Sequence, residues 1–170
     1  MRTASGFGGV EVSDMQFRDQ LDIDVLRQII ANAETVSNDA YLRSVMSFLL
    51  EAHSHQESQE YRQSFVMAWL IIESWLDKAW SDVLNEKMVS KTRQKQLREG
   101  NRFTAEVKSE VLNLLGRIDR DQLSKTTRFR KRRNNVVHEG YDPVQSESQE
   151  ALEFATELCL ARFQAAVAET

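Results

Sequence analysis

The stretch Phe65–Trp80, FVMAWLIIESWLDKAW, decides the fold of this chain. Its apolar side chains occupy nearly every side of a helix, a pattern typical of a helix that its neighbours cover all round. We therefore expect a long central helix over about 57–86, in which Trp69, Trp75 and Trp80 supply bulk. The apolar run 65–72 is too short to span a bilayer, so we expect no membrane segment here.

The rest of the chain also favours helices. It has 170 residues but one proline and 6 glycines, a composition that indicates an all-α fold rather than many short strands. We expect a flexible tail over 1–12 and one helical domain over 13–170. Besides the central helix, the periodicity predicts helices over about 13–33, 37–52, 103–115, 119–139 and 146–168, and a short one within the basic link 87–100.

Capping residues predict where these helices begin and end, and apolar stripes predict which faces are buried. Their expected first residues are Ser37 or Asn38, Asp119 or Asp121, and Ser146; Gly116 and Gly140 are expected stops. The expected inward faces are Val107, Val111, Leu114 and Leu115 in one helix, and Leu152, Ala155, Cys159, Phe163 and Ala166 in the last.

Few residue types suited to disulfides, metals or cofactors are present. Cys159 is the one cysteine, which excludes a disulfide framework, and we expect it to be a small buried apolar residue. His53 and His55 lie in an expected polar link without a third ligand nearby, so we expect no metal site. No phosphate loop or dinucleotide motif indicates a cofactor, and no export segment is recognisable, so we expect a cytoplasmic protein.

The net charge of −4 conceals two basic stretches, 87–102 and 125–133, and an acidic one, 139–157. A localised site for a polyanion explains this asymmetry, and so does an ordinary solvated helical surface. The second basic stretch continues into Arg128–Gly140, RFRKRRNNVVHEG. In a helix, Phe129, Arg133, Val136 and Val137 share one face, whereas Arg128, Arg130, Lys131 and Asn134 lie off it.

Arg133–His138, RNNVVH, resembles the R-N-x-x-x-H signature of HEPN domains, small all-helical proteins that include RNA-cleaving toxins and defence effectors. The resemblance covers about 57–169 and implies an antiparallel helical bundle, to which the two expected N-terminal helices would be additions. It also implies a homodimer that acts on RNA, in some cases neutralised by an antitoxin. Tyr141 is three residues after His138 rather than two, so no tyrosine role is carried over.

The residue chemistry suits metal-independent cleavage of RNA by its own 2′-hydroxyl. His138 is the expected general acid/base, and Arg133 the expected phosphate clamp. Asn134 would orient the imidazole or bind substrate, and the RNA backbone would contact Arg128, Arg130, Lys131 and Arg132. Alternatively, His138 only satisfies helix carbonyls, and the chain is a non-catalytic helical module that binds RNA or a protein.

Glu73 stands within the apolar central helix, where a carboxylate is costly to bury without a partner. Arg133, itself expected among apolar groups, is the expected partner, with Asp77 as a second carboxylate one turn further on. Alternatively, Glu73 and Asp77 form a narrow polar edge that faces water. An acidic residue that faces the signature is also common in HEPN-like proteins, so the resemblance favours the pairing.

Overall fold

The computed structural model describes residues 37–99 and 103–168, which contain α-helices and no strand. The helices are α2 (Ala40–Glu57), α3 (Tyr61–Glu86), α4 (Lys91–Glu99), α5 (Ala105–Leu114), α6 (Arg120–His138) and α7 (Gln145–Ala168). The all-α bundle predicted from the sequence is thus confirmed. The expected tail 1–12 and the expected helix 13–33 lie outside the described residues.

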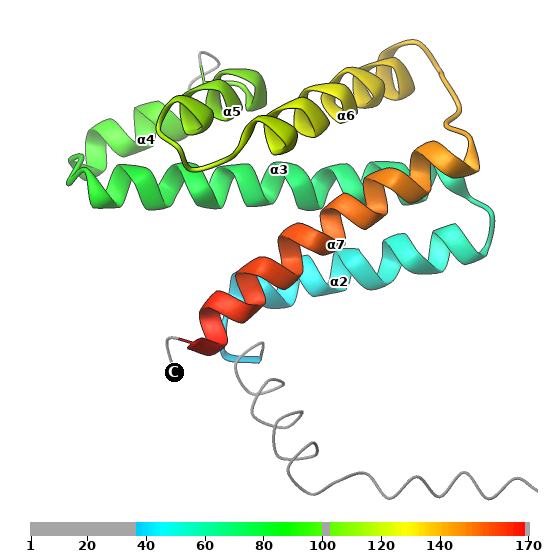
Figure 1. Cartoon of the computed structure of the whole chain (residues 1–170), viewed down its shortest axis with the longest axis horizontal. Helices are drawn as coiled ribbons and strands as arrows, with labels where there is room; N and C mark the ends of the chain where they lie inside the picture. The colour runs from blue at the N-terminus through cyan, green and yellow to red at the C-terminus, as the bar shows by residue number, and fades with distance from the viewer. Residues whose placement is uncertain (1–36, 100–102, 169–170) are drawn as a thin grey trace, which may run out of the picture.

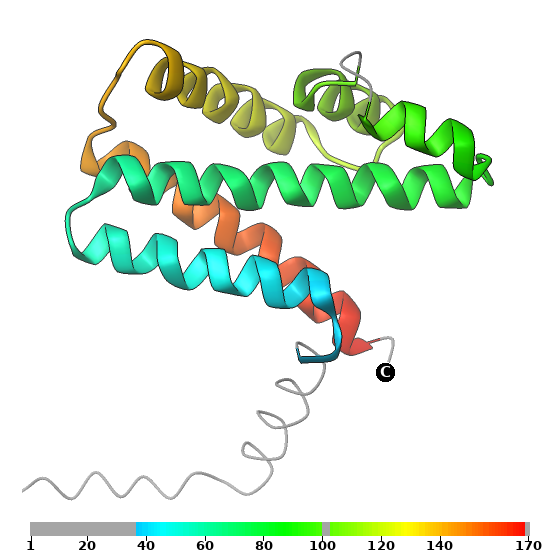
Figure 2. The same ribbon diagram turned by 180° about the vertical axis from the view of Figure 1, so that it is seen from behind.

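Helix α3 runs through the middle of the bundle (Figures 1 and 2). Helices α4, α5 and α6 lie on one side of it, and α2 and α7 lie on the other. Helix α6 follows the first half of α3, whereas α4 and α5 follow its second half. Helices α4, α5 and α6 therefore share one flank of α3, and α2 and α7 share the other. The prediction that several neighbours cover this helix is confirmed.

Two groups of buried side chains attach these helices to α3. Around its first half, Phe65 makes an edge-on contact with Phe129 of α6 at a centroid distance of 6.2 Å. Phe129 in turn lies 5.8 Å from Phe154 of α7, so one aromatic series joins three helices. Around the second half of α3, Trp80 packs with Leu112 of α5. Side chains of α3 therefore belong to both buried groups.

The boundary between α2 and α3 differs from the sequence-based expectation. Asp39, not Ser37 or Asn38, caps α2, because its carboxylate accepts hydrogen bonds from the first free backbone amides. Helix α2 then continues to Glu57, so His53 and His55 lie in a helix and not in a polar link. The chain reverses at Gln59, whose φ is 62°, although no glycine or proline marks this turn in the sequence.

Helix α5 presents a different face to the core from the one its apolar residues suggest. Leu112 is fully buried, whereas Leu114 is 83% exposed and Val107 and Leu115 are also exposed. The buried face includes Lys108 and Ser109, which the apolar pattern does not identify. These polar residues are tolerated because Lys108 Nζ lies 2.6 Å from Asp77 Oδ1 of α3 and the Ser109 hydroxyl donates to a backbone carbonyl.

Two glycines end α5 and α6 as expected, with φ values of 67° at Gly116 and 70° at Gly140. Only glycine adopts this left-handed conformation without a steric cost. Helix α6 begins with a capping box, in which the Asp119 carboxylate accepts from the backbone of Gln122 and the Gln122 side chain accepts from the backbone of Asp119. Asp119, rather than Asp121, is therefore the capping residue.

Helix α7 begins at Gln145, so Ser146 lies inside the helix and does not cap it. The Glu147 carboxylate instead accepts a hydrogen bond from the amide of Val144 at 3.1 Å. On the inner face of α7, Leu152, Ala155 and Cys159 are buried as predicted. Burial raises the pKa of the Cys159 thiol to about 11, which suits an unreactive core residue. No helix in the described ranges is long and apolar enough to cross a membrane.

The two leucines of α5 provide a direct test of its observed orientation. Leu112→Ala should lower the free energy of unfolding by about 2–5 kcal/mol, because it leaves a cavity in the core. Leu114→Ala should change it by less than about 0.5 kcal/mol, because Leu114 already faces water. Denaturant unfolding of both variants measures the difference. A larger loss from Leu114→Ala would mean that α5 is rotated toward the face expected from the sequence.

Candidate functional site

Helix α6 carries the residues of the expected site on three different faces. Phe129 and Val136 are buried against the bundle, as predicted. Val137 is 54% exposed, so its predicted place on the inner face is wrong. The reason is geometric: successive helical residues are about 100° apart, and only the narrow face around Phe129 and Val136 is covered by α3 and α7.

Arg133 is directed toward α3, where it meets Glu73 and Trp69. Its Nη2 lies 3.8 Å from Glu73 Oε2, and its guanidinium carbon lies 5.8 Å from the centroid of the Trp69 ring. The Trp69 indole donates a hydrogen bond of 3.2 Å to the same Glu73 oxygen. The expected pairing of Arg133 with Glu73 is therefore present as an ion pair, at a separation longer than a hydrogen bond.

Asp77, the alternative partner for Arg133, is engaged elsewhere. Its carboxylate lies 2.6 Å from the ammonium of Lys108, whose side chain is buried between α3 and α5. Glu73 and Asp77 are thus each matched with a cation from a different helix, although Asp77 is also exposed to solvent, as the alternative of a polar edge expects. Because the side chains of Arg133 and Glu73 are 31% and 35% exposed, a ligand can still reach their pair.

Most of the other cations of α6 are also paired with carboxylates. Arg128 lies 2.5 Å from Glu150 of α7, and Arg132 lies 2.5 Å from Glu147 of the same helix. Such pairing removes part of the positive charge that the sequence suggests for this surface. The acidic stretch 139–157 therefore neutralises the basic stretch within the same molecule.

Arg130 does not point to water as expected. Its side chain is largely covered, and its Nη2 lies 2.9 Å from Glu106 of α5. Its Nε is buried and has no hydrogen-bond partner among the described residues. Arg130 thus ties α6 to α5, and the structure separates it from the other three cations that were expected to contact RNA.

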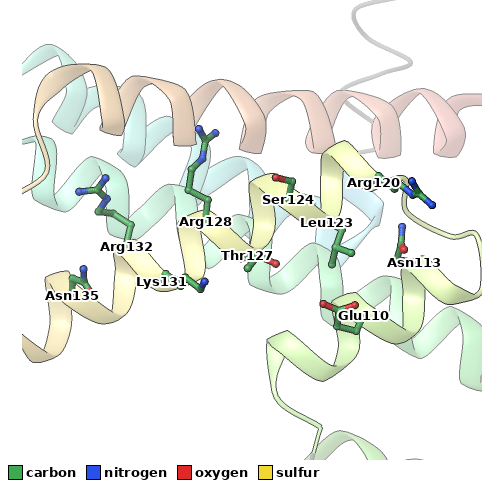
Figure 3. Close-up of a pocket in the computed structure, with 10 residues that line it drawn as sticks. All are labelled: Glu110, Asn113, Arg120, Leu123, Ser124, Thr127, Arg128, Lys131, Arg132 and Asn135. Carbon is green, nitrogen blue, oxygen red and sulfur yellow. The ribbon is translucent and has the colours of Figure 1, made fainter.

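Those three, Arg128, Lys131 and Arg132, line an open groove of about 810 Å³ along the outer side of α5 and α6 (Figure 3). In this view Arg128 and Arg132 extend toward α7, which agrees with their ion pairs. Lys131 is exposed and has no ion pair with any described residue. The remaining lining residues are Glu110, Asn113, Arg120, Leu123, Ser124, Thr127 and Asn135.

His138 is the last residue of α6 and is exposed. It makes no hydrogen bond or ion pair with the residues in the described ranges, so its imidazole is accessible to a ligand. Five residues separate it from Arg133, which corresponds to about 140° around the helix. Arg133 faces the bundle and His138 faces outward, so one chain does not direct both side chains at one point.

Asn134 lies between these two residues on the helix surface. Its side-chain oxygen accepts a hydrogen bond of 3.2 Å from Arg133 Nη1. It is also one turn before His138, so it shares the outward side of α6 with the imidazole. Asn134 therefore contacts the expected phosphate clamp directly, whereas a contact with His138 is not present in this conformation.

Tyr141 and Glu147 form a small polar network beyond the end of α6. The Tyr141 hydroxyl donates a hydrogen bond of 2.8 Å to the Glu147 carboxylate, and the Arg132 guanidinium lies 4.8 Å from the Tyr141 ring centroid. The hydrogen bond to Glu147 raises the pKa of Tyr141 above its usual value, despite the opposing effect of Arg132. Glu147 therefore organises the link between α6 and α7.

The part of the chain that the structure describes contains no group of three or more His, Cys, Asp or Glu residues suited to hold a metal ion. His55 is instead paired with Glu60 at 2.5 Å. Comparisons of the chain with protein-family models, curated proteins and solved structures found no match. The site must accordingly be interpreted from its own geometry.

Several groove residues were missed by the sequence analysis, which followed positive charge alone. Arg120, Ser124 and Thr127 recur at helical spacing and, with the expected Lys131, form one continuous polar stripe along α6. That periodicity is visible in the sequence and could have identified them. Glu110 could not have been found in this way, because it joins the groove only through the packing of α5 against α6.

The Tyr141 pKa provides a test of the network at the end of α6. Glu147→Gln should lower the pKa of Tyr141 toward its ordinary value, because deprotonation no longer places a second negative charge beside a carboxylate. Wild type should ionise this tyrosine only at a pH above that value. The measurement is an absorbance titration of tyrosinate, with Tyr141→Phe to identify the transition and Glu150→Gln as the control. An unchanged titration in Glu147→Gln would contradict the network.

Proposed function

We propose that this protein is a metal-independent endoribonuclease that uses His138 as general acid/base and Arg133 as phosphate clamp. The observation that carries the proposal is the exposed, unpartnered imidazole of His138 at the end of a helix whose outer side is a cationic groove. An imidazole near neutrality can accept or donate a proton, and the groove supplies a surface for a polyanion. The resemblance of Arg133–His138 to the HEPN signature supports the same function.

In the proposed reaction, a ribose 2′-oxygen attacks the adjacent phosphorus as its proton passes to a base. The P–O5′ bond breaks, and an acid delivers a proton to the leaving 5′-oxygen. The products are a 2′,3′-cyclic phosphate and a 5′-hydroxyl, so neither water nor a metal ion is consumed. Arg133 would stabilise the charge on the phosphoryl oxygens, for which its planar guanidinium provides paired donors.

The separation of Arg133 from His138 favours a site shared between two chains. A two-fold axis beside α6 would combine Arg133 of one protomer with His138 of its partner, and isologous dimers are the commonest oligomers. Two exposed apolar residues flank the Arg133–Glu73 pair and could form such an interface: Leu70 is 37% exposed and Val137 is 54% exposed. The internal pairing of the α6 cations would also reduce repulsion between the two helices.

One observation favours a second candidate function, a helical module that binds RNA without cutting it. Arg133 already has an ion pair with Glu73, a contact with the Trp69 ring and a hydrogen bond to Asn134. An arginine held in this way can be a structural element of the bundle rather than a phosphate clamp. The two candidates differ in whether RNA is cleaved, which is directly measurable.

Cleavage of a labelled RNA in excess EDTA tests the proposed reaction. Wild type should cleave, and His138→Ala should reduce the rate by a factor of about 10²–10⁴, the usual contribution of a positioned acid or base. His53→Ala is the matched control, because His53 is also an exposed helical histidine but lies in α2. New ends should carry a cyclic phosphate and a 5′-hydroxyl. Wild-type protein that binds RNA but never cleaves it would favour the non-catalytic module.

Mixing of subunits tests the shared site. When wild-type chains are exchanged with His138→Ala chains, activity should fall as the square of the wild-type fraction if each dimer requires both histidines. Light scattering on the same samples reports the oligomeric state. A linear decrease, or full activity from a demonstrated monomer, would mean that one chain contains a complete site.

A further inference from the structure

We propose that the groove along the outer side of α6 holds the phosphate backbone of a single RNA strand and leads it to His138. This inference rests on the proposed function and specifies where its substrate lies. It starts from a single stripe of α6 that contains Arg120, Ser124, Lys131 and His138. His138 follows Lys131 by seven residues and Arg120 by eighteen, two and five helical turns, so all three project from one side of the helix.

The two cations on this stripe are available for a ligand. Neither Arg120 nor Lys131 has an ion pair with another described residue, and both are exposed. Arg128 and Arg132, by contrast, lie at the edge next to α7, where Glu150 and Glu147 neutralise them. The strongest attraction for an anion is therefore along the middle of the groove, between these pairs and α5.

Polar groups that suit phosphate oxygens lie between the two cations and one turn beyond Lys131 (Figure 3). The hydroxyls of Ser124 and Thr127 and the side-chain amide of Asn135 line the same groove. Hydroxyls, amides, Arg and Lys are the side chains that most often contact nucleic-acid backbones. The lining contains no aromatic residue on which a base could stack, so these contacts should be with the backbone and should discriminate little between sequences.

The dimensions of the stripe favour a strand over a mononucleotide. The eighteen helical rises from Arg120 to His138 extend about 27 Å, which accommodates roughly eight stacked nucleotides at 3.4 Å each. The groove is open along its length, with a volume of about 810 Å³. Glu110 on the α5 wall opposes phosphate binding, so its carboxylate should limit the affinity of the groove.

Fluorescence anisotropy with a labelled 2′-O-methyl RNA of about sixteen nucleotides tests the inference, because this RNA lacks the attacking hydroxyl. Arg120→Ala and Lys131→Ala should each weaken binding roughly five- to tenfold and reduce the salt dependence by about 0.7, the value of one phosphate contact on a single strand. Arg93→Ala and Lys91→Ala are the matched controls, since they remove one exposed cation from α4. They should alter neither quantity.

Removal of a groove carboxylate should have the opposite effect. Glu110→Gln should tighten binding, whereas Glu51→Gln, an exposed glutamate of α2, should leave it unchanged. Circular dichroism and thermal unfolding confirm that each variant is folded, which is expected because all the substituted residues are exposed.

The outcomes separate this inference from the proposed function. If the groove variants weaken binding but wild type does not cleave RNA, the groove is an RNA site of a non-catalytic module. If His138 is required for cleavage but the groove variants bind like the α4 controls, the strand follows another path and the inference is wrong. The inference is also wrong if wild type does not bind the RNA at all and instead binds an acidic protein at Lys131.

Discussion

Apolar side chains on nearly every side of α3 must be removed from water, and one partner helix can cover only one stripe of them. In this protein α2 and α7 cover one flank, and α4, α5 and α6 cover the other. Helix α6 therefore lies at the edge of the bundle, with Phe129 turned inward and an entire side left in contact with solvent. The exposure of the candidate site follows from the way in which the core is enclosed.

Charge pairing then determines which cations of α6 remain available. Glutamates of α7 neutralise Arg128 and Arg132, Glu106 covers Arg130, and Glu73 holds Arg133 near Trp69. Ion pairs between partly exposed side chains contribute little to the free energy of unfolding. Their main effect here is on the electrostatic potential at the surface of α6. Of the five cations in positions 128–133, Lys131 alone has no carboxylate partner among the described residues.

The sequence was sufficient where a feature depends on local chemistry or on a strong apolar pattern. The central helix, the glycine stops at Gly116 and Gly140, and the pairing of Arg133 with Glu73 were all predictable. It was insufficient where packing between distant segments decides. Lys108 is buried because Asp77 lies opposite it, and Val137 is exposed because no helix of the described ranges covers that side. Both features depend on segments that are distant in the sequence, and the periodicity of apolar residues does not reveal which distant segments meet.

The buried thiol of Cys159 has a practical consequence for spectroscopy. With a pKa of about 11, fewer than about one thiol in a thousand is ionised at neutral pH, and the core shields it from reagents. Because it is the one cysteine of the chain, a second cysteine introduced on the surface would react selectively with a maleimide dye or a spin label. Distances between such labels would then report on the proposed dimer in the otherwise native protein.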